Sequence, residues 1–178
     1  MNYAQLYEFL DVDSDGKVEV VISRYNNGYR PGSRPDTVIT VFAQGNDGKY
    51  DTVYDVDDVD GDDDRDDEDR ETYTIAANLV SKMLTLSTVG EQQRYKQILL
   101  SFESGDANAD VVFGHFEESD TDLTTPDLIV KATKLKNGQY SDVLDTSDAN
   151  ADGIINNDDQ LIYRTIANSF RSMKDFQP

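Results

Sequence analysis

The sequence predicts an α+β protein built from two pseudo-symmetric repeats, and two observations lead to this class. First, the chain is internally duplicated: the segment that begins at Pro35 aligns with the one that begins at Pro126, and the alignment continues into matching helical patterns. Second, each copy shows the same order of local patterns, with antiparallel strands and hairpins first, an acidic loop next and an α-helix last. We therefore expect one repeat over residues 1–90 and another over residues 91–178, folded together as one compact domain.

Strand and turn signals occupy the first part of each repeat. VEVVISRY from Val18 and DTVITVFAQ from Asp36 are rich in β-branched and aromatic residues and are bounded by Asn, Gly and Pro, which is typical of strands. The DG and NG pairs in GNDGKY (45–50) and KNGQY (136–140) predict hairpin turns. The segment NNGYRPGSRP (26–35) is expected to be an irregular surface loop.

Helical periodicity follows each acidic loop. Apolar residues recur at three- and four-residue spacing from Ile75 to Leu84 in the first repeat and from Leu161 to Met173 in the second. A stripe of this kind is typical of a helix that packs on a sheet, so we assign these side chains to the core and not to a cofactor site.

The composition is strongly acidic. The 178 residues include 36 Asp and Glu against 16 Lys and Arg, a formal net charge of -20. Such a surface repels nucleic acid and anionic membranes and favours cations or basic partners. The chain has no cysteine, which excludes disulfides and thiolate metal sites. No apolar run is long enough to be inserted across a membrane, and residues 1–13 lack the basic and apolar parts of a signal peptide.

Two twelve-residue stretches, DVDGDDDRDDED (58–69) and DANADGIINNDD (148–159), place oxygen-bearing side chains at positions 1, 3, 5, 9 and 12. Ca²⁺ takes about six to eight oxygen ligands, and a short loop supplies them when alternate residues point inward and a later carboxylate closes the shell. The predicted ligands of the first loop are Asp58, Asp60, Asp62, the backbone carbonyl of Asp64, Asp66 and Asp69. Those of the second loop are Asp148, Asn150, Asp152, the backbone carbonyl of Ile154, Asn156 (directly or through water) and Asp159.

The sixth and twelfth positions separate these loops from a full EF-hand. Gly153 stands at the sixth position of the second loop, where the chain turns sharply, whereas the first loop has Asp63 there. Both loops end in Asp instead of Glu, and no helical pattern precedes them. These loop-helix units resemble dockerin-type calcium loops, which are similar to half of an EF-hand. Coulomb repulsion among the gathered carboxylates implies a loop that is ordered with metal and loose without it.

A third acidic loop leads into a strand instead of a helix. With Gly16 at the turn, it offers oxygens from Asp11, Asp13, Asp15, the Lys17 carbonyl and Glu19. Together with the following strand pair and the GNDGKY turn, this loop resembles the FG-GAP and VCBS repeats of β-propeller blades, whose DxDxDGxxD loop holds calcium. The resemblance covers residues 9–61 and implies as ligands Asp11, Asp13, Asp15 and Glu19. Two repeats are too few to close a propeller.

The second repeat has an altered copy of this third loop. The equivalent positions are Phe102, Ser104, Asp106 and Asp110. Two of the acidic ligands are missing, so we expect this copy to have lost its metal.

The loops together predict a calcium-binding protein, and several functions remain open. We expect a structural or adhesive module of a secreted or cell-surface protein, whose partners are calcium ions and, in the adhesive case, another protein. The alternatives are a cytoplasmic calcium sensor or buffer and a dockerin-like partner of a cohesin-type receptor. A solvated or disordered acidic run, a plain DxDxDG turn or a halophilic surface would explain the acids without a metal.

No catalytic constellation stands out, so we predict that the protein is not an enzyme. His115 is the only histidine, and a lone histidine is more often a packed or surface residue than a base. The sequence has no nucleophile elbow, and paired carboxylates of glycosidase type cannot be told apart from the calcium ligands.

Overall fold

The structure is a computed structural model that describes residues 3–45, 47–59, 62–84, 96–103, 109–117, 122–134, 137–150 and 152–175. Within these residues, eight strands form one antiparallel sheet in the order β4-β3-β2-β1-β5-β6-β7-β8. The strands are β1 (Ala4–Leu10), β2 (Glu19–Tyr25), β3 (Thr37–Phe42), β4 (Thr52–Val53), β5 (Gln97–Phe102), β6 (Val111–Phe116), β7 (Leu128–Lys134) and β8 (Tyr140–Leu144). The described helices are α1 (Asp67–Leu84) and α2 (Asn157–Asp175).

The predicted fold class is wrong. The part of the chain that the structure describes is mostly one eight-stranded antiparallel sheet with two helices, and not an α+β fold of two pseudo-symmetric repeats. At the centre of the sheet β1 pairs with β5, from Ala4↔Ser101 to Glu8↔Gln97, so the sheet continues from one half of the chain into the other. The sequence patterns revealed neither of these strands; β1 contains Ala and Glu, which are depleted in strands. The predicted boundary at residue 90 lies outside the described residues.

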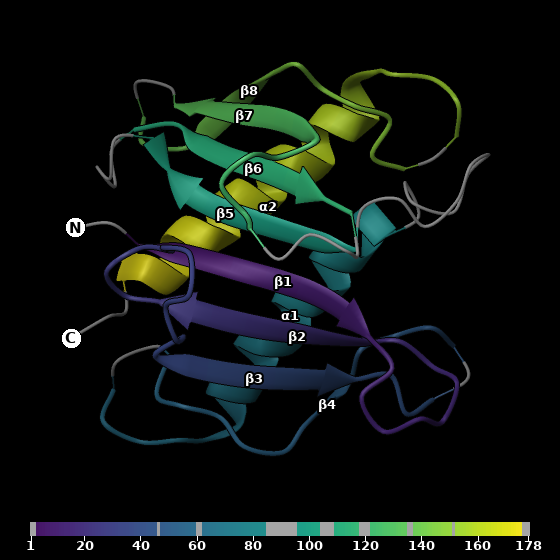
Figure 1. Cartoon of the computed structure of the whole chain (residues 1–178), viewed down its shortest axis with the longest axis vertical. Coiled ribbons are helices and arrows are strands. Elements are labelled where there is room, and N and C mark those ends of the chain that lie inside the picture. Colours follow the sequence, from purple (N-terminus) through teal and green to yellow (C-terminus); the bar gives the residue numbers. More distant parts are fainter. Residues whose placement is uncertain are drawn as a thin grey trace.

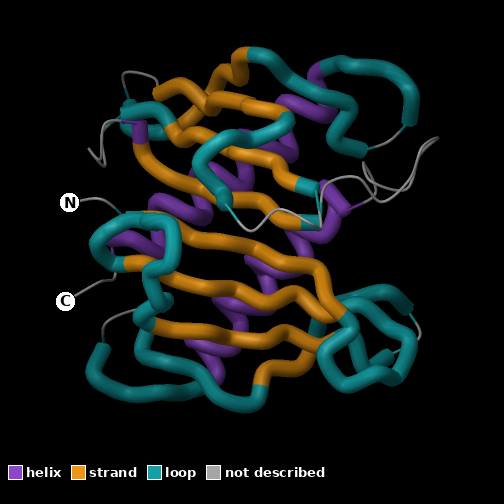
Figure 2. The backbone as a smooth tube through the Cα atoms, viewed as in Figure 1, coloured by secondary structure: helices purple, strands orange, loops and turns teal. Residues whose placement is uncertain are grey.

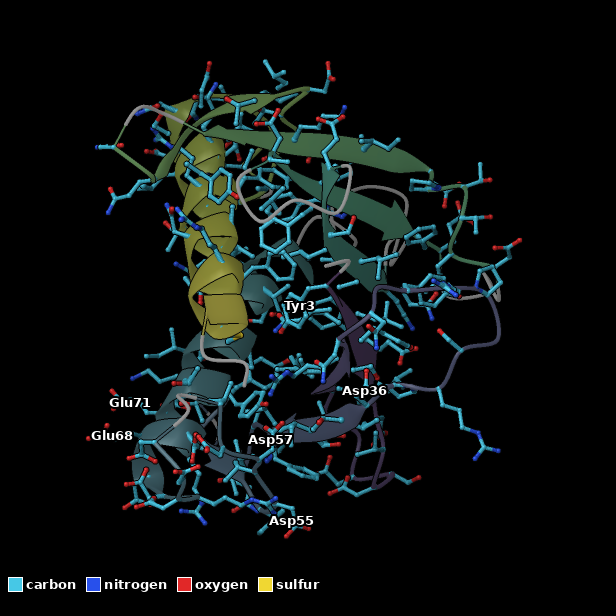
Figure 3. The ribbon with its side chains drawn as sticks, turned by 90° about the vertical axis from the view of Figure 1, so that its left-hand side faces the viewer. Tyr3, Asp36, Asp55, Asp57, Glu68 and Glu71 are labelled. Carbon is cyan, nitrogen blue, oxygen red and sulfur yellow. The ribbon has the colours of Figure 1, made fainter. Side chains whose placement is uncertain are left out.

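Both helices cover the same face of the sheet. Figure 1 shows α1 behind β1–β4 and α2 behind β5–β8, and Figure 3 shows the helix layer and the sheet layer from the side. The main core lies between these layers and includes Phe9, Ile22, Phe113 and Phe170. Because burial of each such side chain contributes about 1.5–3 kcal/mol, this contact is the largest source of stability.

The other face of the sheet carries a smaller apolar cluster. Its buried members are Ala4, Leu6, Tyr25, Phe116 and Leu123. The ring of Tyr25 packs edge-on against Tyr29 in the connection between β2 and β3, with 5.4 Å between ring centroids. The predicted irregular loop 26–35 is this connection, and it contains no strand or helix.

Each helix is tied by an asparagine to a segment at the edge of the sheet. Asn78 on α1 accepts a hydrogen bond from the backbone N–H of Tyr50 (3.0 Å) and donates its amide to the Tyr50 carbonyl (2.6 Å). Asn168 on α2 makes the same two bonds with Tyr140, at 3.0 and 3.3 Å. A side-chain amide used in this way satisfies backbone groups at the edge of the sheet and fixes the helix over them.

Candidate metal centres

The three acidic loops lie at different places on the molecule. One loop joins β1 to β2, and the two twelve-residue loops each lead into a helix. In Figure 1, α1 begins at the lower end of the long axis and α2 begins at the upper end, so their loops lie at opposite ends of the helix layer. Figure 2 shows the connections in teal, some of them beyond the ends of the strands and others in front of the sheet.

The loop between β1 and β2 gathers three carboxylates. Asp11, Asp13 and Asp15 are exposed, and one oxygen from each lies within 4.8 Å of the others. Oxygens on opposite sides of a bound Ca²⁺ are about 4.6–5.2 Å apart, which is twice the usual bond length, so the three oxygens are close enough together to contact one metal ion. The ammonium group of Lys17 donates instead to the backbone carbonyl of Gln44 (2.9 Å).

The same hydrogen bonds between residues close in sequence stabilise all three loops. The carboxylate at position 1 accepts the N–H of position 6, in the pairs Gly16 to Asp11 (3.1 Å), Asp63 to Asp58 (3.0 Å) and Gly153 to Asp148 (2.8 Å). The carboxylate at position 5 accepts the N–H of position 7, in the pairs Lys17 to Asp15 (2.8 Å), Asp64 to Asp62 (3.0 Å) and Ile154 to Asp152 (2.8 Å). An aspartate favours such a turn because its side chain reaches the backbone two residues further on. The acids therefore set the path of each loop as well as its charge.

The sixth position has a positive φ in every loop. Gly16 and Gly153 both have φ of +86°, which costs glycine little. Asp63 has φ of +73°, so the first twelve-residue loop makes the same turn with a residue whose Cβ atom causes steric strain in this conformation. The aspartate is therefore strained but compatible with the turn.

The last carboxylate of each loop is buried. The exposed fractions of Asp69, Asp159 and Glu19 are 1%, 0% and 2%. Each of these acids accepts the N–H of position 2 of its own loop, in the pairs Val59 to Asp69 (2.6 Å), Ala149 to Asp159 (2.7 Å) and Val12 to Glu19 (2.8 Å). The closing acid thus joins the beginning of each loop to its end.

In the two twelve-residue loops, the closing acid also forms a helix cap. Asp159 accepts the N–H of Asn156 (2.8 Å), while the Asn156 side chain accepts the N–H of Asp158 (2.6 Å). Asp69 and Asp66 make the matching bonds before α1. This reciprocal arrangement is a capping box, and it explains why each helix begins at position 10 of its loop, directly after the capping residue.

The predicted ligand sets are brought together only in part. Asp60 lies outside the described residues, as do Ser104 and Asp106 in the altered copy of the third loop. Among the described residues, no set of three acidic side chains other than the cluster at residues 11–15 has its oxygens within 4.8 Å. The six predicted ligands at residues 148–159 are all described, but Asp159 directs both its oxygens at backbone N–H groups.

The charge in the loop between β1 and β2 acts on its buried acid. Burial raises the pKa of Glu19, and the nearby carboxylates of Asp13, Asp15 and Asp11 raise it further, against the hydrogen bond from Val12. A cation bound among these groups would reverse the Coulomb contribution and favour the charged form of Glu19.

Two polar groups that stand directly before the twelve-residue loops were not among the residues predicted from the sequence. Asp57 contacts Arg24 and Tyr73, and Ser147 contacts Tyr163. The internal duplication aligns Asp57 with Ser147 and Tyr73 with Tyr163, which was the available signal. Their partners lie on other elements, so only the folded chain shows what they do.

His115 is packed in the interior, as one of the two default interpretations predicted. It is fully buried on β6, and its Nε2 atom lies 3.2 Å from the Tyr163 hydroxyl. Burial lowers the pKa of His115 from 6.5 to about 4. The imidazole is therefore neutral near pH 7.

No protein-family model matches the sequence, and neither the curated proteins nor the solved structures include a match to it. Neither described helix has both the length and the apolar character needed to cross a membrane.

Proposed function

We propose that the protein is a calcium-binding module that uses its three acidic loops to couple ion binding to folding. The observation that carries the proposal is the common frame of these loops: aspartates at positions 1 and 5, a tight turn at position 6 and one buried acid that closes the loop. In the loop between β1 and β2, this frame already holds three carboxylates at the separation of calcium ligands.

The charge balance supports a divalent ion. Two carboxylates about 4 Å apart repel by roughly 1 kcal/mol even at the dielectric constant of water, and the chain carries a formal charge of -20. A bound Ca²⁺ converts this repulsion into attraction, so each loop is expected to become more ordered when the ion binds. Oxygen-only ligands at flexible spacing suit Ca²⁺ better than Mg²⁺, which requires a stricter octahedral geometry.

The position of the loops favours a structural or adhesive role. Two of them lie at the beginnings of helices that form one layer of the core, so ion binding stabilises the contact between helix and sheet. Loops that end in Asp suggest dissociation constants on the order of 10⁻⁶ to 10⁻³ M. Affinities at the weak end of this range match extracellular calcium, which supports the proposal of a secreted or cell-surface protein.

Calorimetric titration of the intact chain with Ca²⁺ and Mg²⁺ tests the proposal. We expect Asp58→Ala and Asp148→Ala each to remove about one calcium site, because each removes the acid at position 1, and we expect Mg²⁺ to compete poorly. The matched controls are Glu68→Ala and Asp158→Ala, which remove the same charge from position 11, where no ligand is predicted. Unchanged stoichiometry in both position 1 variants would contradict the proposal.

A further inference from the structure

We propose that Tyr73 and Tyr163 are positioning residues for the two twelve-residue loops. Each tyrosine holds the residue before a loop against the helix that follows it, and thereby strengthens metal binding by that loop. The inference rests on the proposed calcium-binding function. It concerns groups that are not ligands themselves.

In the first half of the chain, the tyrosine bridges a charged pair. Tyr73 is buried on α1, four residues after the closing acid Asp69. Its hydroxyl donates to one carboxylate oxygen of Asp57 and accepts a hydrogen bond from Arg24 at 2.7 Å. Arg24 also donates to the other Asp57 oxygen at 2.7 Å, and the Thr37 hydroxyl donates to the same oxygen at 3.1 Å. Figure 3 shows Asp57 between the helix layer and the sheet.

The second half uses the same positions without charge. Tyr163 is buried on α2, four residues after the closing acid Asp159. Its hydroxyl shares a hydrogen bond of 2.6 Å with Ser147, which directly precedes the first residue of the loop, and lies 3.2 Å from Nε2 of His115. Ser147 and His115 thus stand where the first half of the chain has Asp57 and Arg24.

Each tyrosine closes the base of a loop. The hydrogen bond joins the residue before the first predicted ligand to the tyrosine, which lies one helical turn after the last predicted ligand. A loop whose two ends are held in this way loses less conformational freedom when an ion binds, so its affinity is higher. Removal of the hydroxyl alone isolates this effect, because removal of Arg24 or Asp57 would also change the Coulomb attraction for a cation.

The variants Tyr73→Phe and Tyr163→Phe form a reciprocal test that keeps the packed ring and the net charge. Calcium binding to each loop of the full chain is followed by NMR at a temperature where every variant is folded. We expect Tyr73→Phe to weaken binding at residues 58–69 by about tenfold and to leave residues 148–159 unchanged, because it loses bonds to charged groups. We expect Tyr163→Phe to weaken binding by about threefold at residues 148–159 only, because the hydrogen bonds lost to Ser147 and His115 are to groups that are uncharged near pH 7.

A third variant separates positioning from a general loss of stability. Tyr140→Phe removes a hydroxyl that donates to the backbone carbonyl of Ala109 (2.9 Å), away from both twelve-residue loops, and is expected to lower stability without changing either affinity. In chelator, hydrogen exchange at the N–H of Val59 should accelerate only in Tyr73→Phe, and exchange at the N–H of Ala149 only in Tyr163→Phe.

The outcomes distinguish the two proposals. If the unmodified chain binds no calcium, the proposed function is overturned, and the positioning role is overturned with it. If the unmodified chain binds calcium but both affinities stay the same in the two loop variants, only the positioning role is overturned. The positioning role alone is also overturned if every variant, Tyr140→Phe included, lowers the calcium affinity of both loops equally.

Discussion

At the scale of single residues, the turn at position 6 gives the clearest test of backbone strain. Asp63 has φ of +73°, where the other two loops have glycine at +86°. We expect Asp63→Gly to raise the free energy of unfolding in chelator by about 0.5–1 kcal/mol, because relief of the left-handed strain exceeds the added entropy of glycine in the unfolded chain. Urea unfolding measures the change.

The control for this variant is Asp63→Asn, which removes the same negative charge and keeps the Cβ atom. Less stabilisation in Asp63→Asn than in Asp63→Gly supports strain as the cause. Equal stabilisation in the two variants would instead assign the effect to charge repulsion within the loop.

His115 gives a second prediction at this scale. Because burial lowers its pKa from 6.5 to about 4, the unfolded chain binds a proton at this residue in a pH range where the folded chain does not. The contribution of the neutral imidazole to the free energy of unfolding is therefore complete above about pH 6.5. It is lost as the pH falls toward 4, and the total loss is roughly 3 kcal/mol.

The measurement is urea unfolding of metal-free protein at pH 7 and pH 5, compared with His115→Gln. The carboxylates titrate in both proteins, so the difference between the two pH dependences reports on the histidine. We expect the unmodified protein to lose about 2 kcal/mol more than the variant between these pH values. An identical loss in both proteins would contradict the buried neutral imidazole.

At the scale of elements, the asparagines that tie the helices to the edge of the sheet have a measurable role. Asn78→Ala leaves the backbone N–H and carbonyl of Tyr50 without their side-chain partners, and Asn168→Ala does the same at Tyr140. We expect each variant to lower the free energy of unfolding by about 1–3 kcal/mol, measured by thermal or urea unfolding.

Asn→Asp at the same positions is the informative companion, since a carboxylate still accepts the backbone N–H but cannot donate to the carbonyl. The carboxylate oxygen that replaces the amide nitrogen of Asn78 would face the carbonyl oxygens of Tyr50 and Thr74, so we expect Asn78→Asp to lower the free energy of unfolding at least as much as Asn78→Ala. Alanine variants as stable as the unmodified protein would show that water replaces both bonds at this edge.

The sequence predicted some of the helices, strands and loops but not others. The periodicity after each acidic loop predicted both helices, because an amphipathic helix records its buried face every three to four residues. The central strands β1 and β5 were missed because their pairing joins segments about 90 residues apart, and no local pattern records such a contact. The alternating acids predicted the candidate loops, whereas the burial of Asp69 and Asp159 follows from helix capping in the folded chain.

At the scale of the whole molecule, the two twelve-residue loops are separated by the length of the helix layer. Their helices begin at opposite ends of the molecule, although α1 packs against α2. Distant sites without shared partners usually contribute to stability additively. The proposed calcium sites should therefore stabilise the fold independently, unlike a pair of loops that share one surface.

We accordingly expect the stabilisation by calcium to be the sum of separate contributions. With free Ca²⁺ at about 100 times the dissociation constant, each loop adds about 2.7 kcal/mol to the free energy of unfolding, and Asp58→Ala or Asp148→Ala removes one such contribution. The double variant should lose the sum of the two within about 0.5 kcal/mol. Urea unfolding in calcium and in chelator, with NaCl used to keep the ionic strength equal, measures each contribution apart from general screening of the -20 charge. A loss in the double variant that differs clearly from the sum would mean that the packed helices transmit binding from one end of the molecule to the other.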